Sequence, residues 1–77
     1  MDTQSRVTTV IQSVTDKKVS GDGEESLFES GILDSFALPD LVSALEKEFG
    51  VKIPDSDLNP RKFESVVRIT EYVESRM

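Results

Sequence analysis

The chain has 77 residues, a net charge of −6, and neither cysteine nor histidine. This length allows a single domain over residues 1–77. Without cysteine or histidine the chain cannot form a disulfide, a thiolate or imidazole metal site, or a serine–histidine catalytic pair, so we expect it not to be an enzyme. The acidic balance also argues against binding to nucleic acid, because phosphates attract basic surfaces.

Hydropathy gives no sign of a membrane protein. No apolar run approaches the ~18 residues that can span a bilayer, and the polar start MDTQS is unlike a secretory signal. The 36% hydrophobic and 31% charged residues are typical of a compact folded domain. We therefore expect a cytoplasmic, free-standing and monomeric chain without a membrane span.

The first periodic stretch is SRVTTVIQSV. Its apolar residues recur at helical spacing, at Val7, Val10, Ile11 and Val14. Because they do not alternate as in a strand, we predict a helix that is capped by Asp2 or Thr3 and runs to about Asp16. The following segment, KKVSGDGEES, is predicted to be loop. It continues into SLFESGIL, whose large apolar side chains should pin a long loop to the core.

A second helix has the clearest apolar stripe, formed by Leu38, Leu41, Val42, Leu45 and Phe49. Gly50 is a stop signal, and VKIP should be extended because the residue before Pro54 avoids the helical region. The segment DSDLNPRKF is expected to hold one short helical turn.

The last predicted helix covers Glu64 to Ser75. Its inner face would consist of Val66, Ile69 and Val73, with Phe63 or Tyr72 at the edge. The fold class predicted from these elements is all-α: a small bundle of three main helices plus a short helical turn, with a long first loop.

The stretch GILDSFALPD places Asp34 and Ser35 directly before the second helix. One interpretation is a helix cap, because the side-chain oxygens of Asp and Ser bind free N–H groups in the first turn. The other is a modification site, at which an exposed Ser35 is the substrate of another enzyme, since the chain has no histidine to act as its own base. A phosphate on Ser35 would then face unpaired N–H groups at the positive end of the helix.

The run LFESGILDSFALPDLVSALEKEFGVKIPDSDL resembles the acyl carrier proteins. The similarity lies in a Gly, an Asp-Ser pair followed by a large apolar residue, a Leu-rich helix and EFGVKIP. The resemblance implies that Ser35 carries 4′-phosphopantetheine through a phosphodiester and that Asp34 is the motif acid that assists the modifying enzyme. The thiol of this group would hold an acyl or aminoacyl cargo as a thioester for delivery to partner enzymes.

The same resemblance implies which partners the chain meets. They would be a phosphopantetheinyl transferase, an acyl- or aminoacyl-loading ligase and downstream acyl-transfer enzymes with basic docking patches. Asp40, Glu46 and Glu48 match acidic family positions and would face those patches, unless they are ordinary solvated helix charges. Phe36 would contact partners or cargo, or lie over the edge of the core.

Two departures from the family pattern favour a specialised carrier, including the D-alanyl carrier type. Ala37 and Lys47 stand where carriers of fatty-acid synthesis commonly have acids, and SGILDSF differs from the motif of that class. Pro39 cannot donate a helical hydrogen bond, so we predict a delayed or distorted start of the second helix, with Pro39 in its first turn and Ser35 outside it. The alternatives are a housekeeping carrier of fatty-acid synthesis and an unmodified carrier-like interaction module.

Overall fold

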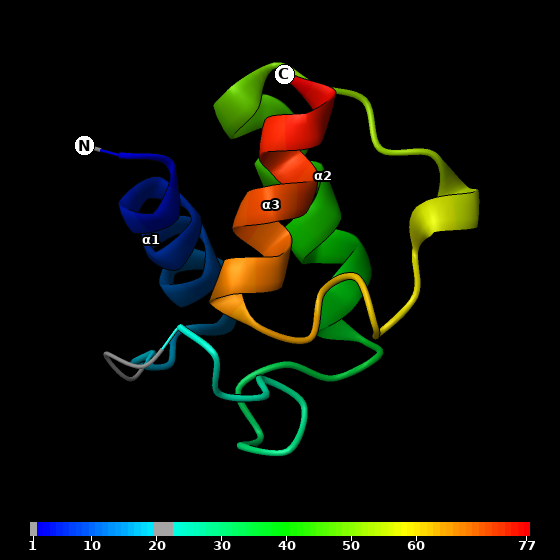
Figure 1. The fold of residues 1–77 in the computed structure, drawn as a ribbon. Helices are drawn as coiled ribbons and strands as arrows, with labels where there is room; N and C mark the ends of the chain where they lie inside the picture. The colour runs from blue at the N-terminus through cyan, green and yellow to red at the C-terminus, as the bar shows by residue number, and fades with distance from the viewer. Residues whose placement is uncertain (1, 20–22) are drawn as a thin grey trace.

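The computed structural model describes residues 2–19 and 23–77. The described ranges contain three α-helices, one 3-10 turn and no strand, which confirms the all-α fold class. The elements in chain order are α1 (Thr3–Thr15), α2 (Ala37–Phe49), the 3-10 turn η1 (Asp55–Asp57) and α3 (Val66–Arg76). Helix α1 packs against both α2 and α3 and runs opposite to them (Figure 1). No helix in these ranges is long and apolar enough to cross a membrane.

Helix α1 has the ends that its sequence predicts. The Asp2 carboxylate accepts a hydrogen bond from the Ser5 N–H at 2.7 Å, which satisfies one of the donors at the helix start. Asp16 ends the helix in the left-handed conformation, with a φ of 56°. The β-branched residues of α1 fold as a helix because the 3.6-residue period buries Val7, Val10 and Ile11 together.

Helix α3 begins two residues later than the sequence predicted. Ser65 is the cap residue, with an extended backbone and a hydroxyl that accepts a hydrogen bond from the Arg68 N–H at 3.2 Å. Glu64 therefore lies outside the helix. Phe63 does not lie at the helix edge but is fully buried, and its ring meets that of Tyr72 edge to face with the centroids 5.4 Å apart.

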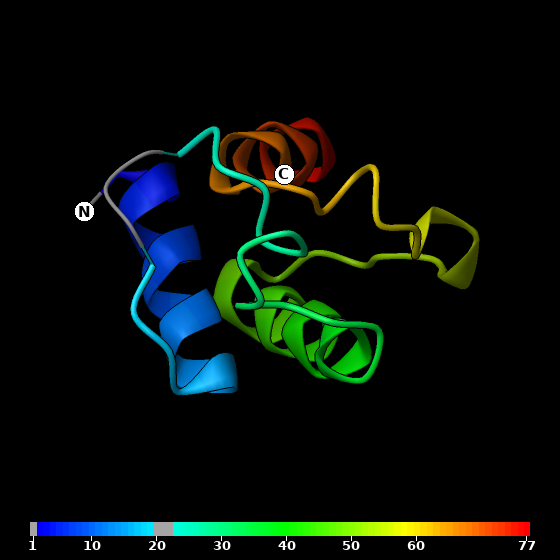
Figure 2. The ribbon, with the colours of Figure 1, turned by 90° about the horizontal axis from the view of Figure 1, so that it is seen from below.

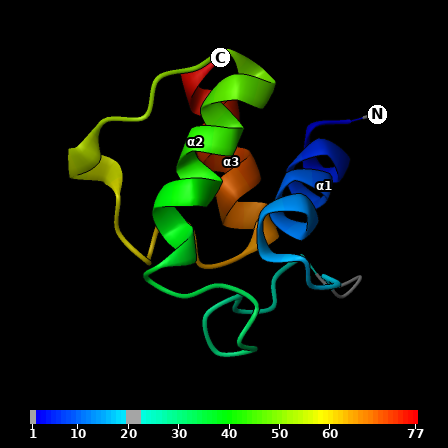
Figure 3. The same ribbon diagram turned by 180° about the vertical axis from the view of Figure 1, so that it is seen from behind.

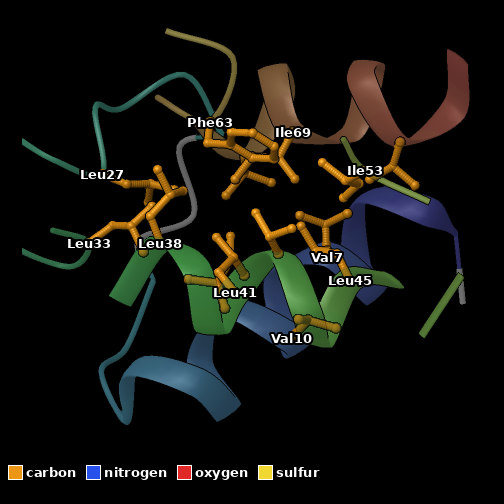
Figure 4. Packing of buried hydrophobic residues seen from close by; sticks show 14 of the residues in the cluster. Val7, Val10, Leu27, Leu33, Leu38, Leu41, Leu45, Ile53, Phe63 and Ile69 are labelled. Atoms are coloured by element: carbon orange, nitrogen blue, oxygen red, sulfur yellow. The ribbon is translucent and has the colours of Figure 1, made fainter. Parts of the chain in front are cut away.

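One hydrophobic core joins all three helices and both connections (Figure 4). Its buried side chains are Val7, Val10, Ile11, Leu27, Leu33, Leu38, Leu41, Val42, Leu45, Val51, Ile53, Phe63, Val66, Ile69 and Val73. The second connection contributes through its extended segment, as predicted for VKIP, and η1 is the short helical turn expected after it.

The long first loop crosses the end of the bundle at which α2 and α3 begin (Figure 2). As predicted, it is pinned to the core by apolar side chains, since Leu27 and Leu33 are buried. Its backbone is also tied to the start of α3: the Leu27 N–H donates to the Glu64 carbonyl at 2.7 Å, and the Gly23 carbonyl accepts from the Val67 N–H at 2.9 Å. Residues 20–22 of the predicted loop lie outside the described ranges.

Candidate functional site

The predicted modification site lies at the end of the bundle where the long loop enters α2 (Figure 3). Residues 35 and 36 form a turn directly before the first helical residue, Ala37. Ser35 is exposed, so its hydroxyl is accessible to an approaching enzyme. An attached group can extend into solvent from this turn without displacing the core.

Asp34 acts as the cap of this turn. Its Oδ1 atom accepts hydrogen bonds from the Phe36 N–H at 2.9 Å and from the Ala37 N–H at 2.8 Å. Its carbonyl accepts from the Leu38 N–H at 3.0 Å. The prediction that a phosphate on Ser35 would face unpaired N–H groups is therefore wrong for Phe36 and Ala37, because the Asp34 carboxylate already accepts from both.

Pro39 explains where α2 starts. It is the third residue of the helix, and the helix begins at Ala37 instead of at Ser35, which confirms the predicted delayed start. The first N–H groups of a helix have no intrahelical acceptor, so a proline in the first turn loses little. Pro39 has no N–H to donate to the Ser35 carbonyl, so one rung of the helical ladder is missing there, and the Leu38 N–H bond to the Asp34 carbonyl stands apart from the continuous ladder of α2.

The loop before Asp34 is fixed by contacts that sequence reasoning did not find. The Lys17 Nζ atom donates to the Gly31 carbonyl at 2.6 Å, which connects the end of α1 to this loop. Gly31 has a φ of 81°, and the following N–H groups of Ile32 and Leu33 both donate to the Leu27 carbonyl at 3.0 Å. A lysine just after a helix carries no sequence signal for such a contact, because its acceptor is a backbone carbonyl 14 residues away.

The two predicted partner-binding residues nearest Ser35 face solvent. Phe36 is 88% exposed, an unusual state for a large apolar side chain. Asp40 is exposed and, among the described residues, makes no side-chain hydrogen bond or ion pair. Both side chains are therefore available to a partner that approaches the exposed Ser35.

The other two predicted acids have intramolecular partners. Glu46 is half-buried, and its carboxylate accepts from the Ile53 N–H at 2.8 Å. Glu48 is paired with Arg6 at 2.9 Å, and the same arginine donates to the Glu48 carbonyl at 2.8 Å. These contacts hold the end of α2 to the second connection and to α1, respectively.

A separate cluster of ionisable groups fastens the second connection to α3. The Asp57 carboxylate accepts from the Tyr72 hydroxyl at 2.6 Å and from the Lys62 ammonium at 3.0 Å. Burial and the hydrogen bond to Asp57 raise the pKa of Tyr72 to about 12. The hydrogen bonds from Tyr72 and then Lys62 lower the pKa of Asp57. The cluster is a structural tie, because it joins side chains of one connection and one helix without a reactive group at its centre.

The turn at Ser35 has the exposure that a modification site requires. Asp34 is the acid next to Ser35 in the chain, and its Oδ1 is occupied by two backbone N–H groups. Within residues 2–19 and 23–77 no group of three or more acidic side chains is arranged to hold a metal ion. The exposed hydroxyl of Ser35 therefore fits a covalently attached phosphodiester, for which accessibility is the main requirement.

Comparison with known proteins identifies the family. Residues 5–73 match the family model described as "Phosphopantetheine attachment site". The chain is similar to the D-alanyl carrier protein of Lactobacillus acidophilus, with 28% identity over 75 residues, 97% of this chain and 95% of the relative. It is also similar to D-alanyl carrier protein 2 of Lactiplantibacillus plantarum, with 30% identity over 74 residues, 96% of this chain and 92% of the relative. The D-alanyl carrier protein of Streptococcus sanguinis is 30% identical over 73 residues, 95% of this chain and 92% of the relative.

These matches span nearly the whole chain, and they agree with the helical fold and with the exposed serine before α2. The chain belongs to the phosphopantetheine-attachment family and is a carrier protein that holds 4′-phosphopantetheine covalently.

Proposed function

We propose that Ser35 is the attachment residue. The observation that carries this proposal is the exposure of Ser35 in the turn that Asp34 caps directly before α2. In the modification the Ser35 Oγ would form a bond to the phosphorus of the pantetheine phosphate of coenzyme A. The bond from that phosphorus to the nucleotide phosphate breaks, and the hydroxyl proton passes to a base of the modifying enzyme.

Asp34 would contribute by holding this turn. Its carboxylate fixes the N–H groups on the C-terminal side of Ser35, so the hydroxyl is presented in one backbone conformation. Presentation of a preformed turn lowers the entropy cost for the modifying enzyme. A direct contact of the carboxylate with the transferase would slow the modification of Asp34→Asn even where that variant keeps its stability.

The cargo that we favour is a small aminoacyl group, held as a thioester on the pantetheine thiol. Relatives that match the chain over almost its whole length are D-alanyl carrier proteins, which supports a specialised pathway over fatty-acid synthesis. The chain itself would be a non-catalytic, cytoplasmic and monomeric shuttle between a phosphopantetheinyl transferase, a loading ligase and a downstream acyl-transfer enzyme.

The attachment residue is tested by intact mass after incubation with coenzyme A and a broad-range phosphopantetheinyl transferase. We expect a phosphopantetheine-sized gain in the wild-type chain and none in Ser35→Ala. Ser43→Ala is the matched control, because Ser43 is also exposed but lies within α2, and it should gain the same mass as the wild type. An unmodified wild-type chain that is fully folded would instead favour the interaction module.

The cargo is tested on the modified chain with purified ligases. We expect a D-alanine-activating ligase with ATP and D-alanine to load the thiol, and an acyl ligase with a long-chain fatty acid to load it poorly. Release of the cargo by neutral hydroxylamine checks that it is a thioester. Efficient loading by the fatty-acid enzyme alone would favour the housekeeping carrier.

A further inference from the structure

The loop segment that leads to the proposed attachment serine folds back on itself. The Leu27 carbonyl accepts hydrogen bonds from the N–H groups of Ile32 and Leu33, both at 3.0 Å, so the chain closes onto its own beginning. Gly31 makes the turn with a φ of 81°, in the left-handed region that favours glycine. We name residues 26–33 the serine loop, because the proposed attachment serine follows shortly after them.

Two contacts tie the serine loop to the rest of the bundle. The Leu27 N–H donates to the Glu64 carbonyl at 2.7 Å, which holds the beginning of the loop to the start of α3. The Lys17 Nζ atom donates to the Gly31 carbonyl at 2.6 Å, which holds the turn of the loop to the end of α1. The loop passes both of these places before it enters α2 (Figure 3). Of the two ties, the one from Lys17 is made by a side chain, so a substitution can remove it.

The Lys17 contact is local in its effect. Lys17 is exposed, and its hydrogen bond has to offset the rotamer entropy that an ordered lysine loses. Leu27 and Leu33 stay buried in the core without it, so the serine loop remains attached to the bundle. The contact therefore fixes one carbonyl at the turn, where glycine leaves the backbone the most freedom.

We infer that Lys17 is a positioning residue for the modification of Ser35, acting through the Gly31 carbonyl. The inference rests on the proposed attachment at Ser35. Asp34 fixes the N–H groups that follow the serine, whereas Lys17 fixes a carbonyl that precedes it, so the backbone is held on both sides of the reacting hydroxyl. The serine oxygen must meet the phosphorus of coenzyme A in a near-attack geometry, and a misplacement of about 1 Å can lower a rate by about 100-fold.

The expected kinetic signature is a loss in kcat with KM nearly unchanged. The contact of Lys17 with Gly31 joins α1 to the serine loop and involves no residue of α2, so its removal should leave the exposed face of that helix as it is. A serine loop that occupies the competent conformation for only part of the time lowers the rate of the bound complex by that fraction. For one hydrogen bond we expect kcat of Lys17→Met to fall by about three- to tenfold.

The experiment measures kcat and KM for modification by a broad-range phosphopantetheinyl transferase, well below the melting temperature of every variant. Lys17→Arg should keep at least about half of the wild-type kcat, because a guanidinium N–H can donate to the same carbonyl. Lys18→Met is the matched control: it removes the same charge from the next exposed residue, whose side chain makes no hydrogen bond or ion pair to a described residue. Its kcat should stay within about twofold of the wild type.

A second variant perturbs the same turn from the other partner. Apart from its chain neighbours, Gly31 has no heavy atom within 4 Å of the position that a Cβ would take, so Gly31→Ala acts through its positive φ alone. It should lower kcat as Lys17→Met does. In the double variant kcat should fall by less than the product of the two single effects, because both substitutions release one loop conformation. A fully multiplicative loss would show that they act separately, and it would overturn the inference.

The outcomes separate the positioning role from a structural role and from the proposed function. A purely structural Lys17 would lower the melting temperature of Lys17→Met and leave its kcat at the wild-type value, which would overturn the inference. An equal loss in Lys18→Met would do the same, because it would assign the effect to charge. No mass gain in the wild type, or a gain in Ser35→Ala, would show that the attachment site is wrong. Modification at Ser35 with an unchanged kcat in Lys17→Met would refute the positioning role alone.

Discussion

Replacement of Asp34 by alanine tests how the start of α2 is held. The Asp34 Oδ1 accepts from two N–H groups, at 2.9 and 2.8 Å, and no other side chain of the described residues caps this end of the helix. Loss of a capping residue costs about 1 kcal/mol of the free energy of unfolding. For a domain of this size we expect the melting temperature of Asp34→Ala to fall by about 4–8 °C.

Asp34→Asn is the matched variant. The asparagine side chain keeps an oxygen that can accept from both N–H groups and loses the negative charge near the positive end of the helix. That charge contributes about 0.3–1 kcal/mol, so the asparagine variant should retain more of the stability than the alanine variant.

The assay is thermal and urea unfolding of the unmodified chain, followed by far-UV circular dichroism, with amide hydrogen exchange at Phe36 and Ala37. We expect faster exchange of these two amides in Asp34→Ala and near-wild-type exchange in Asp34→Asn. Equal melting temperatures for the wild type and Asp34→Ala would refute the capping role. If Asp34→Asn keeps its stability but is modified much more slowly by the transferase, the carboxylate also acts directly on the modifying enzyme.

The remaining predictions concern Tyr72, Gly50 and Glu46. Tyr72 is the chain's one tyrosine, so its absorbance near 295 nm should titrate with a pKa of about 12. Asp57→Asn should lower that pKa toward 10.0, and a wild-type pKa near 10.0 would contradict the hydrogen bond. Because the folded pKa of Tyr72 is raised, its contribution to the free energy of unfolding should be fully present below pH 10 and should decline as the pH rises toward 12. Urea unfolding should show a weaker decline in Asp57→Asn. Gly50→Ala should lower the free energy of unfolding by about 1 kcal/mol in urea, because Gly50 has a φ of 65°. Gly50→Asn should lower it by less, and equal losses in the two variants would argue against backbone strain. Glu46→Ala should lower the free energy of unfolding by about 1 kcal/mol, because it leaves the Ile53 N–H without its acceptor. Glu46→Gln should leave it nearly unchanged. An alanine variant as stable as the wild type would show that the contact is dispensable.

The three acids of α2 differ in their intramolecular contacts, and this difference changes which of them is expected to face a partner. Sequence position alone places Asp40, Glu46 and Glu48 together as helix charges. In the folded chain only Asp40 stays without an intramolecular side-chain contact among the described residues. Charge-reversal experiments on all three acids would therefore mix docking with stability, because Glu46→Lys and Glu48→Lys also break contacts that hold α2 in place.

The sequence by itself determined the helices, the class of protein and the candidate site. Periodic apolar residues predict α1 and α2 because helix formation depends on residues three and four apart, which are visible in the chain. Local steric rules were enough to predict that Pro39 delays the start of α2. The motif around Asp34 and Ser35 predicted a phosphopantetheine carrier, and the family match confirms that class.

Only the tertiary structure decided which groups around the site are already engaged. The contacts of Lys17 with Gly31, and of Glu46 with Ile53, join a side chain to a backbone group on another segment, and the sequence has no pattern for such pairs. The pairing of Arg6 with Glu48 spans 42 residues and exists because α1 packs beside α2. The exposure of Phe36 has the same origin: it depends on which face of α2 the core buries, and folding of the whole chain sets that face.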